Sequence, residues 1–464
     1  MSSHYIVLDK YRDEIVSGSV VRVLFKIGLP LMLFNIVMLL YNIADAYWLS
    51  RYSQYAVSIP RQSWPVLMLF NAFIMSFSSA NMAIISQYIG ARMYDRVNST
   101  VSYLFTLNLT YSLLSFTALN LFVYHVFKYI VRTPEEIFFE TINYVRVFSI
   151  DVLLNSFVFT LSITMQCIGD TRTPARVQIY GVVLNAILDP FLINGFYSIP
   201  SLGAIGAALA SVISRIVSLI ILYVVFIRKY SFIKIKPSLR IDRDWFRLTI
   251  RAGLPIYAMQ VSNMFAFVIN HSIINSLGIV AATAFAVGFL ILDIADNVLM
   301  GFTQAATVII GQNLGAGNTG RSREIAVKSS HILFLIISIG SIFVYFFRRN
   351  FIEIFVKDSC IVSETDLFVS LSALTLPFFG LFFMGLAVGR GSGYTLIPTL
   401  IGITRLWIVR IFFGYYISIV MGMGTYGYWL AITISNFLGG LLAYIWIRYG
   451  KWNKPIIKKQ QIVK

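Results

Sequence analysis

The chain has 464 residues, of which 58% are hydrophobic and 12% are charged, with a mean hydropathy of +0.77 and a formal net charge of +17. Soluble domains are about half apolar and about a quarter charged, so this composition predicts an integral membrane protein. The basic residues lie in short connectors between apolar stretches, which argues against nucleic-acid binding. Cys167 and Cys360 fall in different halves, and no His or Cys cluster has metal-ligand spacing, so neither a disulfide nor a metal site is expected.

Twelve apolar stretches follow one another along the chain, each long enough to cross about 30 Å of hydrocarbon as a helix. They cover residues 27–50, 62–86, 101–126, 144–167, 174–196, 204–227, 247–275, 279–310, 328–347, 367–389, 395–420 and 425–448. The predicted fold is an all-α membrane protein with twelve transmembrane helices.

Lys and Arg are concentrated in alternate connectors between these stretches. With the N-terminus placed inside, 26 basic residues lie in inner segments and 7 in outer ones. Because cytoplasmic loops carry the excess of Lys and Arg, both termini are predicted to be cytoplasmic, in the plasma or inner membrane. We expect a monomer in a lipid bilayer.

Four groups of residues recur in the second half of the chain at nearly constant offsets of 225, 225, 224 and 221. The matched residues are Gly28-Leu29-Pro30 with Gly253-Leu254-Pro255; Gln87, Gly90 and Ala91 with Gln312, Gly315 and Ala316; Gly169, Thr171 and Pro174 with Gly393, Thr395 and Pro398; and Gly203, Gly206 and Ser214 with Gly424, Gly427 and Ser435. Two homologous six-helix lobes are predicted, an N-lobe (1–230) and a C-lobe (247–464), joined by a cytoplasmic linker (231–246). Parallel repeats of this kind are typical of transporters that work by alternating access.

Ionisable residues within a membrane span are costly and usually face a cavity in which they act. In this sequence they are Asp45, Arg146, Asp151, Asp189, Arg215, His271, Asp293, Asp296, Arg405 and Arg410. The repeat provides a control for two of them, because its offsets match Asp45 to Asn270 and Asp189 to Phe413. The C-lobe therefore builds the same helices without either acid, which indicates a specific task for both.

Asp45 and Asp189 are predicted to lie at a common depth, roughly 7–11 Å below the outer surface at 1.5 Å per helical residue. Each shares a helical face with other oxygen-bearing side chains: Tyr41 and Asn42 near Asp45, and Asn185 near Asp189. Such oxygens suit Na⁺, and two neighbouring carboxylates can equally carry H⁺. The alternative is a structural pair satisfied by the backbone or by an arginine such as Arg215.

Other polar residues leave alternatives open. Asp151 either serves the site or neutralises Arg146 on its own helix. Asp293 and Asp296 are either structural or a second polar patch. Pro30 is either a shared structural break, since it recurs as Pro255, or a bend that changes with the state of the nearby acid.

Several motifs closely resemble the MATE (multidrug and toxic compound extrusion) transporters, and acids confined to the N-lobe are similar to the DinF-like branch. They are YNIADAYWL at 41–49, QCIGDTRTP at 166–174, NAILDP at 185–190, GAALA at 206–210 and GQNLGAG at 311–317. The resemblance implies efflux of bulky, often cationic or amphipathic organic compounds, driven by inward movement of Na⁺ or H⁺, with no other cofactor.

The resemblance also implies roles for single residues. Asp45, Asn185 and Asp189 match the ion-site residues of that branch, where Na⁺ is a possible ligand. Further matches are two accessory polar positions on the fourth helix, a hydroxyl on the sixth and a bend in the first, which fall on Tyr144, Asn155, Ser211 and Pro30.

Three other functions fit the sequence less well. A flippase for a lipid-linked precursor would share the two-lobe plan, but such proteins often have more helices and a strongly cationic cavity. An enzyme is disfavoured because the sequence has no nucleophile–base pair, metal-ligand set or phosphate-cradling loop, and a nucleotide-driven pump because it has no GxxxxGK[ST] motif.

Overall fold

The computed structural model describes residues 6–53, 55–195, 200–238 and 240–457, and every regular element in these ranges is helical. The α-helices are α1 (Ile6–Ser17), α2 (Val20–Tyr52), α3 (Ser58–Gly90), α4 (Tyr94–His125), α5 (Glu135–Ile168), α6 (Arg172–Asn194), α7 (Gly203–Lys229), α8 (Arg243–Ser276), α9 (Ile279–Gly315), α10 (Thr319–Phe355), α11 (Ser359–Ser392), α12 (Leu396–Thr404) and α13 (Gly424–Tyr449). π-Helical segments at Val126–Val131, Arg405–Phe413 and Tyr416–Val420 extend α4 and α12.

The described residues contain eleven helical stretches long and apolar enough to cross a membrane, or twelve when the bent helix α9 is included as one span. Helix α9 bends by 43° between Asp293 and Asp296. The predicted all-α fold is therefore confirmed. The short helix α1 was not predicted, because its apolar residues are too few for a span; two of them, Leu8 and Ile15, are buried.

The chain divides into two compact units, and the division differs from the predicted lobe limits in two respects. Unit 1 comprises Met1–Arg12 and Leu33–Ile250, so it includes the predicted linker. Unit 2 comprises Asp13–Met32 and Arg251–Lys464. The division thus falls within α1, α2 and α8, and in α2 it lies just after Pro30.

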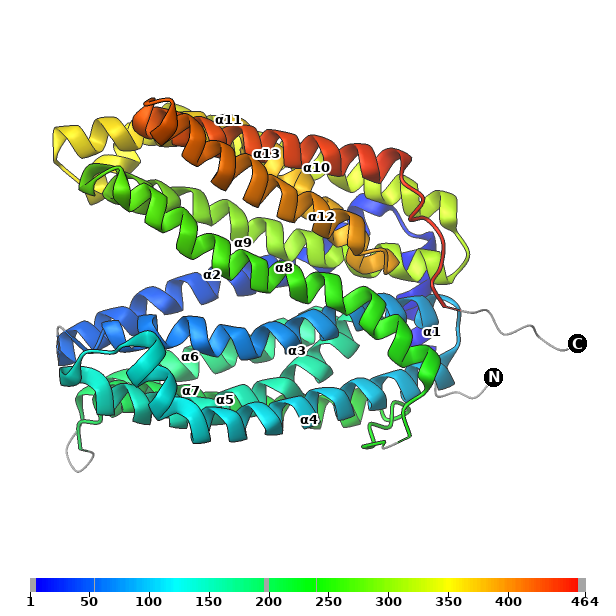
Figure 1. Ribbon diagram of the computed structural model, residues 1–464. Helices are drawn as coiled ribbons and strands as arrows, with labels where there is room; N and C mark the ends of the chain where they lie inside the picture. The colour runs from blue at the N-terminus through cyan, green and yellow to red at the C-terminus, as the bar shows by residue number, and fades with distance from the viewer. Residues whose placement is uncertain (1–5, 54, 196–199, 239, 458–464) are drawn as a thin grey trace, which may run out of the picture. The chain divides into compact units, whose positions relative to one another are not determined.

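In unit 1, helix α5 packs against α3, α4 and α7, and α6 packs against α7 (Figure 1). The buried apolar core includes Leu49, Ile59, Leu67, Phe127, Tyr144, Val145, Val152, Ile193 and Ala208. Polar side chains tie the linker end of α8 to α3: Trp245 Nε1 donates to Asn81 Oδ1 at 2.8 Å. The five helices α3 to α7 therefore form one bundle, which contains Asn185 and Asp189.

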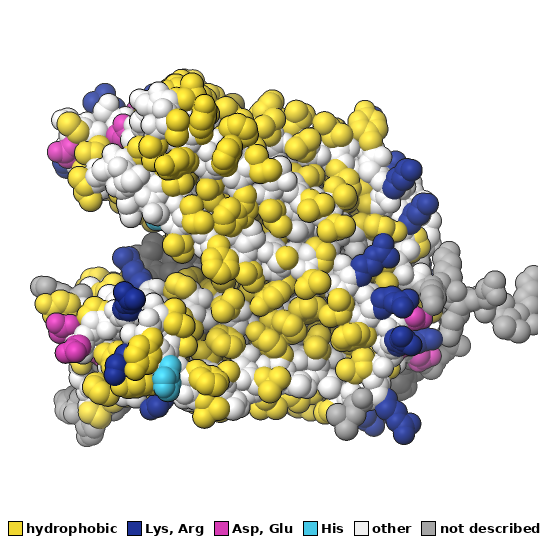
Figure 2. All heavy atoms as spheres, viewed as in Figure 1, with side chains coloured by type: hydrophobic (Ala, Val, Ile, Leu, Met, Phe, Trp, Pro, Cys, Tyr) yellow, Lys and Arg dark blue, Asp and Glu magenta, His cyan; other side chains and the backbone are white. Residues whose placement is uncertain are grey.

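In unit 2, helix α11 packs against α9, α10 and α13, and the π-helical segment after α12 packs against α13. The apolar clusters include Phe302, Ile309, Leu333 and Met384 on one side, and Phe285, Phe368 and Trp429 on the other. Figure 2 shows hydrophobic side chains along the flanks of the helices and charged ones at their ends, which is the pattern that lipid contact requires.

The backbone repeats as the sequence does. Helices α5 and α11 end at Gly169 and Gly393, which have φ values of 109° and 84°. Gly203 and Gly424, which begin α7 and α13, have φ values of 56° and 58°. Because side chains make the left-handed region costly, matched glycines at these turns indicate that both units use one backbone plan.

Gly440 provides a test of the packing between α13 and α11. A Cβ at this position would lie 2.1 Å from the backbone oxygen of Phe378, so Gly440→Ala must push the two helices apart. We expect a loss of about 1–3 kcal/mol, seen as a lower thermal midpoint in detergent. Gly340→Ala on α10 is the control, because nothing lies within 4 Å of its Cβ and the midpoint should not fall. Equal midpoints for the two variants would contradict this packing.

Candidate ion-binding site

The predicted ion-site residues of unit 1 come together from helices α2, α6 and α7. Asp189 on α6 is completely buried, and Asn185 one turn earlier is 6% exposed. The amide of Asn185 is oriented by its neighbours. With its nitrogen towards Asp189, Nδ2 donates to Asp189 Oδ1 at 2.9 Å, while its oxygen accepts from Ser211 Oγ at 3.1 Å. In this orientation Nδ2 also lies 3.2 Å from the Tyr41 hydroxyl, so Asn185 joins α6 to both α2 and α7.

Asp45 is the second acid of this site. Its Oδ1 atom is buried and accepts no hydrogen bond from the residues that the structure describes. Asp45 lies close enough to Asp189 for their charges to interact. Neither carboxylate has a basic partner among the ion pairs of the described residues, and two charged carboxylates would be costly in this setting.

Two tyrosines border the acids. The hydroxyl groups of Tyr41 on α2 and Tyr144 on α5 both lie within electrostatic range of Asp45 and Asp189. The ring of Tyr144 is 6% exposed and stacks on Phe148 at 5.6 Å. Tyr144 thus lies beside the acids, as its accessory assignment would require.

The structure places the remaining predicted residues differently. Asn155 donates to Asn71 on α3 at 3.3 Å. The sequence does not predict this polar pair, because Asn71 lies within an apolar stretch. Pro30 lies inside α2 but in unit 2. The side chain of Asn42 lies outside the described residues. Of the accessory residues, Tyr144 and Ser211 therefore contact or approach the acid site, and Asn155 contacts a separate polar pair.

The expectation that Asp151 neutralises Arg146 is wrong. Asp151 is 4% exposed and forms an ion pair with Arg215 on α7, with Oδ1 2.8 Å from Nε. Residues five apart on an α-helix point about 140° away from each other, so Arg146 cannot reach Asp151 easily. Arg215 is thus engaged by Asp151, which removes Arg215 as the partner in the structural alternative for Asp45 and Asp189.

In unit 2, the positions that match Asp45 and Asp189 carry Asn270 and Phe413, neither of which is an acid. Asn270, which matches Asp45, accepts a hydrogen bond from the Tyr428 hydroxyl at 2.7 Å. Phe413, which matches Asp189, is 46% exposed and apolar. The Asn270 amide oxygen thus accepts a hydrogen bond, whereas Asp45 Oδ1 accepts none from the described residues.

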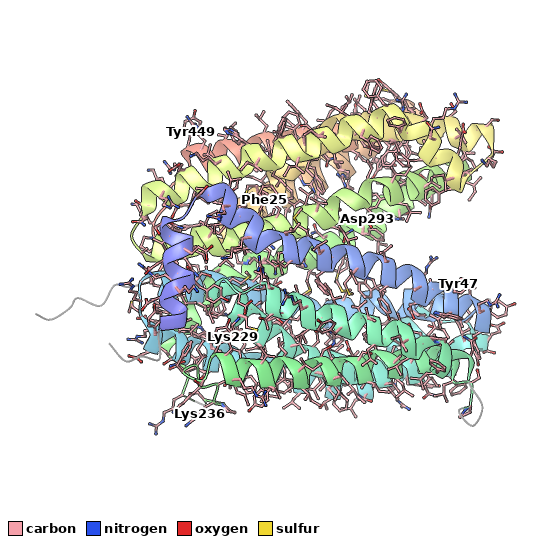
Figure 3. The ribbon with its side chains drawn as sticks, turned by 180° about the vertical axis from the view of Figure 1, so that it is seen from behind. Phe25, Tyr47, Lys229, Lys236, Asp293 and Tyr449 are labelled. Carbon is pink, nitrogen blue, oxygen red and sulfur yellow. The ribbon has the colours of Figure 1, made fainter. Side chains whose placement is uncertain are left out.

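Asp293 and Asp296 lie on either side of the bend in α9, and their charges interact. Asn297 donates to the backbone oxygen of Asp293 at 3.0 Å. Asp296 also lies within electrostatic range of Arg405 and Arg410. Figure 3 labels Asp293 on this helix. The choice between a structural role and a second polar patch for these two acids stays open.

Metal chelation has no other candidate in the described part of the chain, where no group of three or more His, Cys, Asp or Glu side chains could hold a metal ion.

Duplicated helical units with helices long and apolar enough to cross a membrane, and with the acids Asp45 and Asp189 in unit 1, define a multi-pass membrane transporter. The chain belongs to the MatE family, whose model matches residues 30–191 and again residues 255–416. The two matches reproduce the internal repeat and cover both units. MatE proteins are transporters, which confirms that the chain is not an enzyme.

Individual relatives cover nearly the whole chain. The probable multidrug resistance protein YpnP of Bacillus subtilis is 24% identical over 445 residues, covering 95% of this chain and 97% of the relative. The multidrug export protein MepA of Staphylococcus aureus is 24% identical over 417 residues, covering 85% and 88%. A crystal structure of MATE in the bent conformation has a TM-score of 0.87 at 21% identity, covering 96% of this chain and 97% of the other, and shows the shared fold.

Proposed function

We propose that the chain is a secondary antiporter that expels small organic compounds, cationic or amphipathic in character, and takes up protons in exchange by alternating access. The observation that carries this proposal is the pair of acids in unit 1: Asp189 is fully buried, and Asp45 next to it keeps a buried oxygen without a hydrogen bond. The multidrug names of YpnP and MepA support the substrate class.

The orientation of Asn185 favours a proton over Na⁺. Its amide nitrogen faces the Asp189 carboxylate, while its oxygen is occupied by Ser211. A Na⁺ ion at Asp189 would meet N–H donors where it needs oxygen ligands, whereas a carboxylate that alternates between charged and neutral forms keeps this hydrogen bond. We therefore propose that Asp45 and Asp189 carry the proton that is exchanged for the substrate.

The distribution of basic residues supports an orientation in the plasma or inner membrane in which both termini lie in the cytoplasm. We also propose that the chain acts as a monomer. Substrate then leaves the cytoplasm as protons enter it.

Dye efflux from proteoliposomes tests the coupling. Vesicles loaded with rhodamine 6G are diluted into buffer at equal pH, into buffer one pH unit more acidic, or into buffer with added Na⁺ at equal pH. A gradient of one pH unit can drive about a tenfold concentration ratio per proton, so we expect faster release into the acidic buffer only. Acceleration by Na⁺ alone would overturn the assignment of the proton, and no acceleration by either ion would overturn antiport. Protein-free vesicles serve as the control.

A further inference from the structure

Two arginines of unit 2 lie side by side within a membrane span. Arg405 and Arg410 belong to the π-helical segment Arg405–Phe413, and both donate to the same atom, Asn436 Oδ1 on α13, each at 2.9 Å. Two such bonds to one oxygen leave the donor nitrogens at most about 6 Å apart, a distance at which like charges repel. Short π-helical segments are frequent at functional sites.

No carboxylate neutralises this arginine pair in the part of the chain that the structure describes. None of the ion pairs found there includes Arg405 or Arg410. Asp296 affects both guanidinium groups only through space. Arg410 also donates to Ser435 Oγ at 3.1 Å, but the Nε atom of Arg405 is buried and has no hydrogen-bond partner. A guanidinium carries five N–H donors, so most donors of the pair are unused.

The repeat shows that the helix contact made by Arg405 does not require a charge. In unit 1, a Cβ on Gly181 would meet Ser218 Oγ at 2.1 Å; in unit 2, a Cβ on Gly439 would meet Arg405 Cδ at 2.5 Å. The offsets of 224 and 221 match Gly181 to Arg405 and Ser218 to Gly439. The same helix contact is thus made in unit 1 without a charge. In unit 2, Gly439 on α13 has no side chain, and Arg405 occupies the space that such a side chain would fill.

Two aromatic rings lie beside the Arg405 guanidinium. The guanidinium carbon lies 4.9 Å from the ring centre of Phe379 and 4.3 Å from that of Phe382, both on α11. Contacts of this kind with aromatic rings stabilise a guanidinium without using its N–H donors. Both arginine residues are partly exposed, although Arg405 Nε is buried, so a ligand would have to approach the terminal nitrogens.

We propose that Arg405 and Arg410 bind an oxyanion, namely the carboxylate or phosphate group of an organic molecule. Planar guanidinium groups pair with such groups through two parallel hydrogen bonds, and two of them compensate the negative charge in a low-dielectric setting. The site lies in unit 2 and is separate from the acid pair of unit 1. It extends the proposed function to substrates that carry an acid group, and its binding test does not depend on whether transport is coupled to protons.

Calorimetric titration of the purified protein in a neutral detergent tests this site, with 1-naphthoate as the probe and 1-naphthalenemethanol as its uncharged match. We expect 1-naphthoate to bind wild type more tightly than the alcohol, and its affinity to fall about tenfold or more in Arg405→Gln and in Arg410→Gln. Arg349→Gln, which changes an exposed arginine paired with Glu353, is the matched control and should bind as wild type does.

Two further variants separate binding from folding. Arg405→Lys keeps the charge and should retain part of the affinity, while Asp296→Asn removes the nearest competing charge and should strengthen 1-naphthoate binding, a direction that a purely structural role would not produce. Equal affinity for the two probes in wild type, or unchanged 1-naphthoate binding in both glutamine variants, would overturn the proposal. Repeating the titration with phosphatidylglycerol or with phosphatidylcholine in the detergent shows which molecule supplies the oxyanion. If phosphatidylglycerol alone competes with 1-naphthoate, the occupant is a lipid phosphate. If neither lipid competes, the occupant is a soluble acid.

Discussion

Asp189→Asn is expected to reduce acid-driven dye efflux about tenfold, to the rate seen without a gradient. The amide keeps the size of the side chain and its place beside Asn185, but it cannot take up or release a proton. Asp45→Asn should have the same effect, since its unpaired oxygen belongs to the same electrostatic site. The measurement is rhodamine 6G release from proteoliposomes under a gradient of one pH unit.

Two controls distinguish loss of coupling from loss of folding. Asp95→Asn makes the same chemical change at an exposed position in the first turn of α4, and it should leave efflux unchanged. Thermal midpoints in detergent should be equal or higher for Asp45→Asn and Asp189→Asn, because each change removes a costly buried charge. Full acid-driven efflux in both site variants would show that the acids do not couple transport.

Asp170→Asn is expected to lower the stability of unit 1 by about 2–3 kcal/mol at neutral pH. Asp170 follows the glycine that ends α5 and is 4% exposed. It accepts hydrogen bonds from Lys229 Nζ and the Tyr230 hydroxyl, each at 2.7 Å, and from Thr173 Oγ1 at 2.6 Å. Lys229, labelled in Figure 3, also donates to the Tyr11 hydroxyl of α1. The asparagine leaves these donors only partly satisfied, which a lower thermal midpoint should reveal.

The pH dependence of this effect has a definite sign. Burial alone would raise the pKa of Asp170, but hydrogen bonds from Lys229, Thr173 and Tyr230 outweigh it and hold this pKa below its usual value of 3.8. Burial and the Asp170 charge raise the pKa of Tyr230, so that hydroxyl stays a donor. The charged form of Asp170 therefore stabilises the fold above about pH 4, and this contribution is lost as the pH falls through the lowered pKa.

The midpoint difference between wild type and Asp170→Asn should accordingly be constant from about pH 5 to 7 and shrink below about pH 4. Asp242→Asn is the control: its carboxylate pairs with Arg96 at 3.3 Å on an exposed surface, and the loss should stay under about 1 kcal/mol. A difference for Asp170→Asn no larger than that of the control would contradict the buried cluster.

The sequence was sufficient for features that depend on local pattern or on duplication. Span length predicted the helices because hydrocarbon thickness sets a minimum run of apolar residues. The repeat predicted matched turns, and Gly169 and Gly393 adopt the same left-handed conformation. It also singled out Asp45 and Asp189, since the second half of the chain has an amide and a phenyl ring in their places.

Features that depend on packing between helices could not be predicted from the sequence. The partner of Asp151 is Arg215 because α5 packs against α7, whereas the sequence offered only the nearer Arg146. The direction of the Asn185 amide follows from Ser211 on another helix. Arg405 and Arg410 were recognised as buried charges, but their meeting at Asn436 depends on the π-helical turn that carries them.

The exchange of protons for substrate at Asp45 and Asp189 is tested most directly by following the protons themselves. Vesicles that enclose a pH-sensitive dye and a high concentration of rhodamine 6G are diluted into dye-free buffer at equal pH, so that only the substrate gradient drives movement. Wild type is predicted to acidify the lumen as rhodamine leaves, and the double variant Asp45→Asn/Asp189→Asn to show no such acidification. Equal acidification by both proteins would contradict the assignment of the proton site to these two acids.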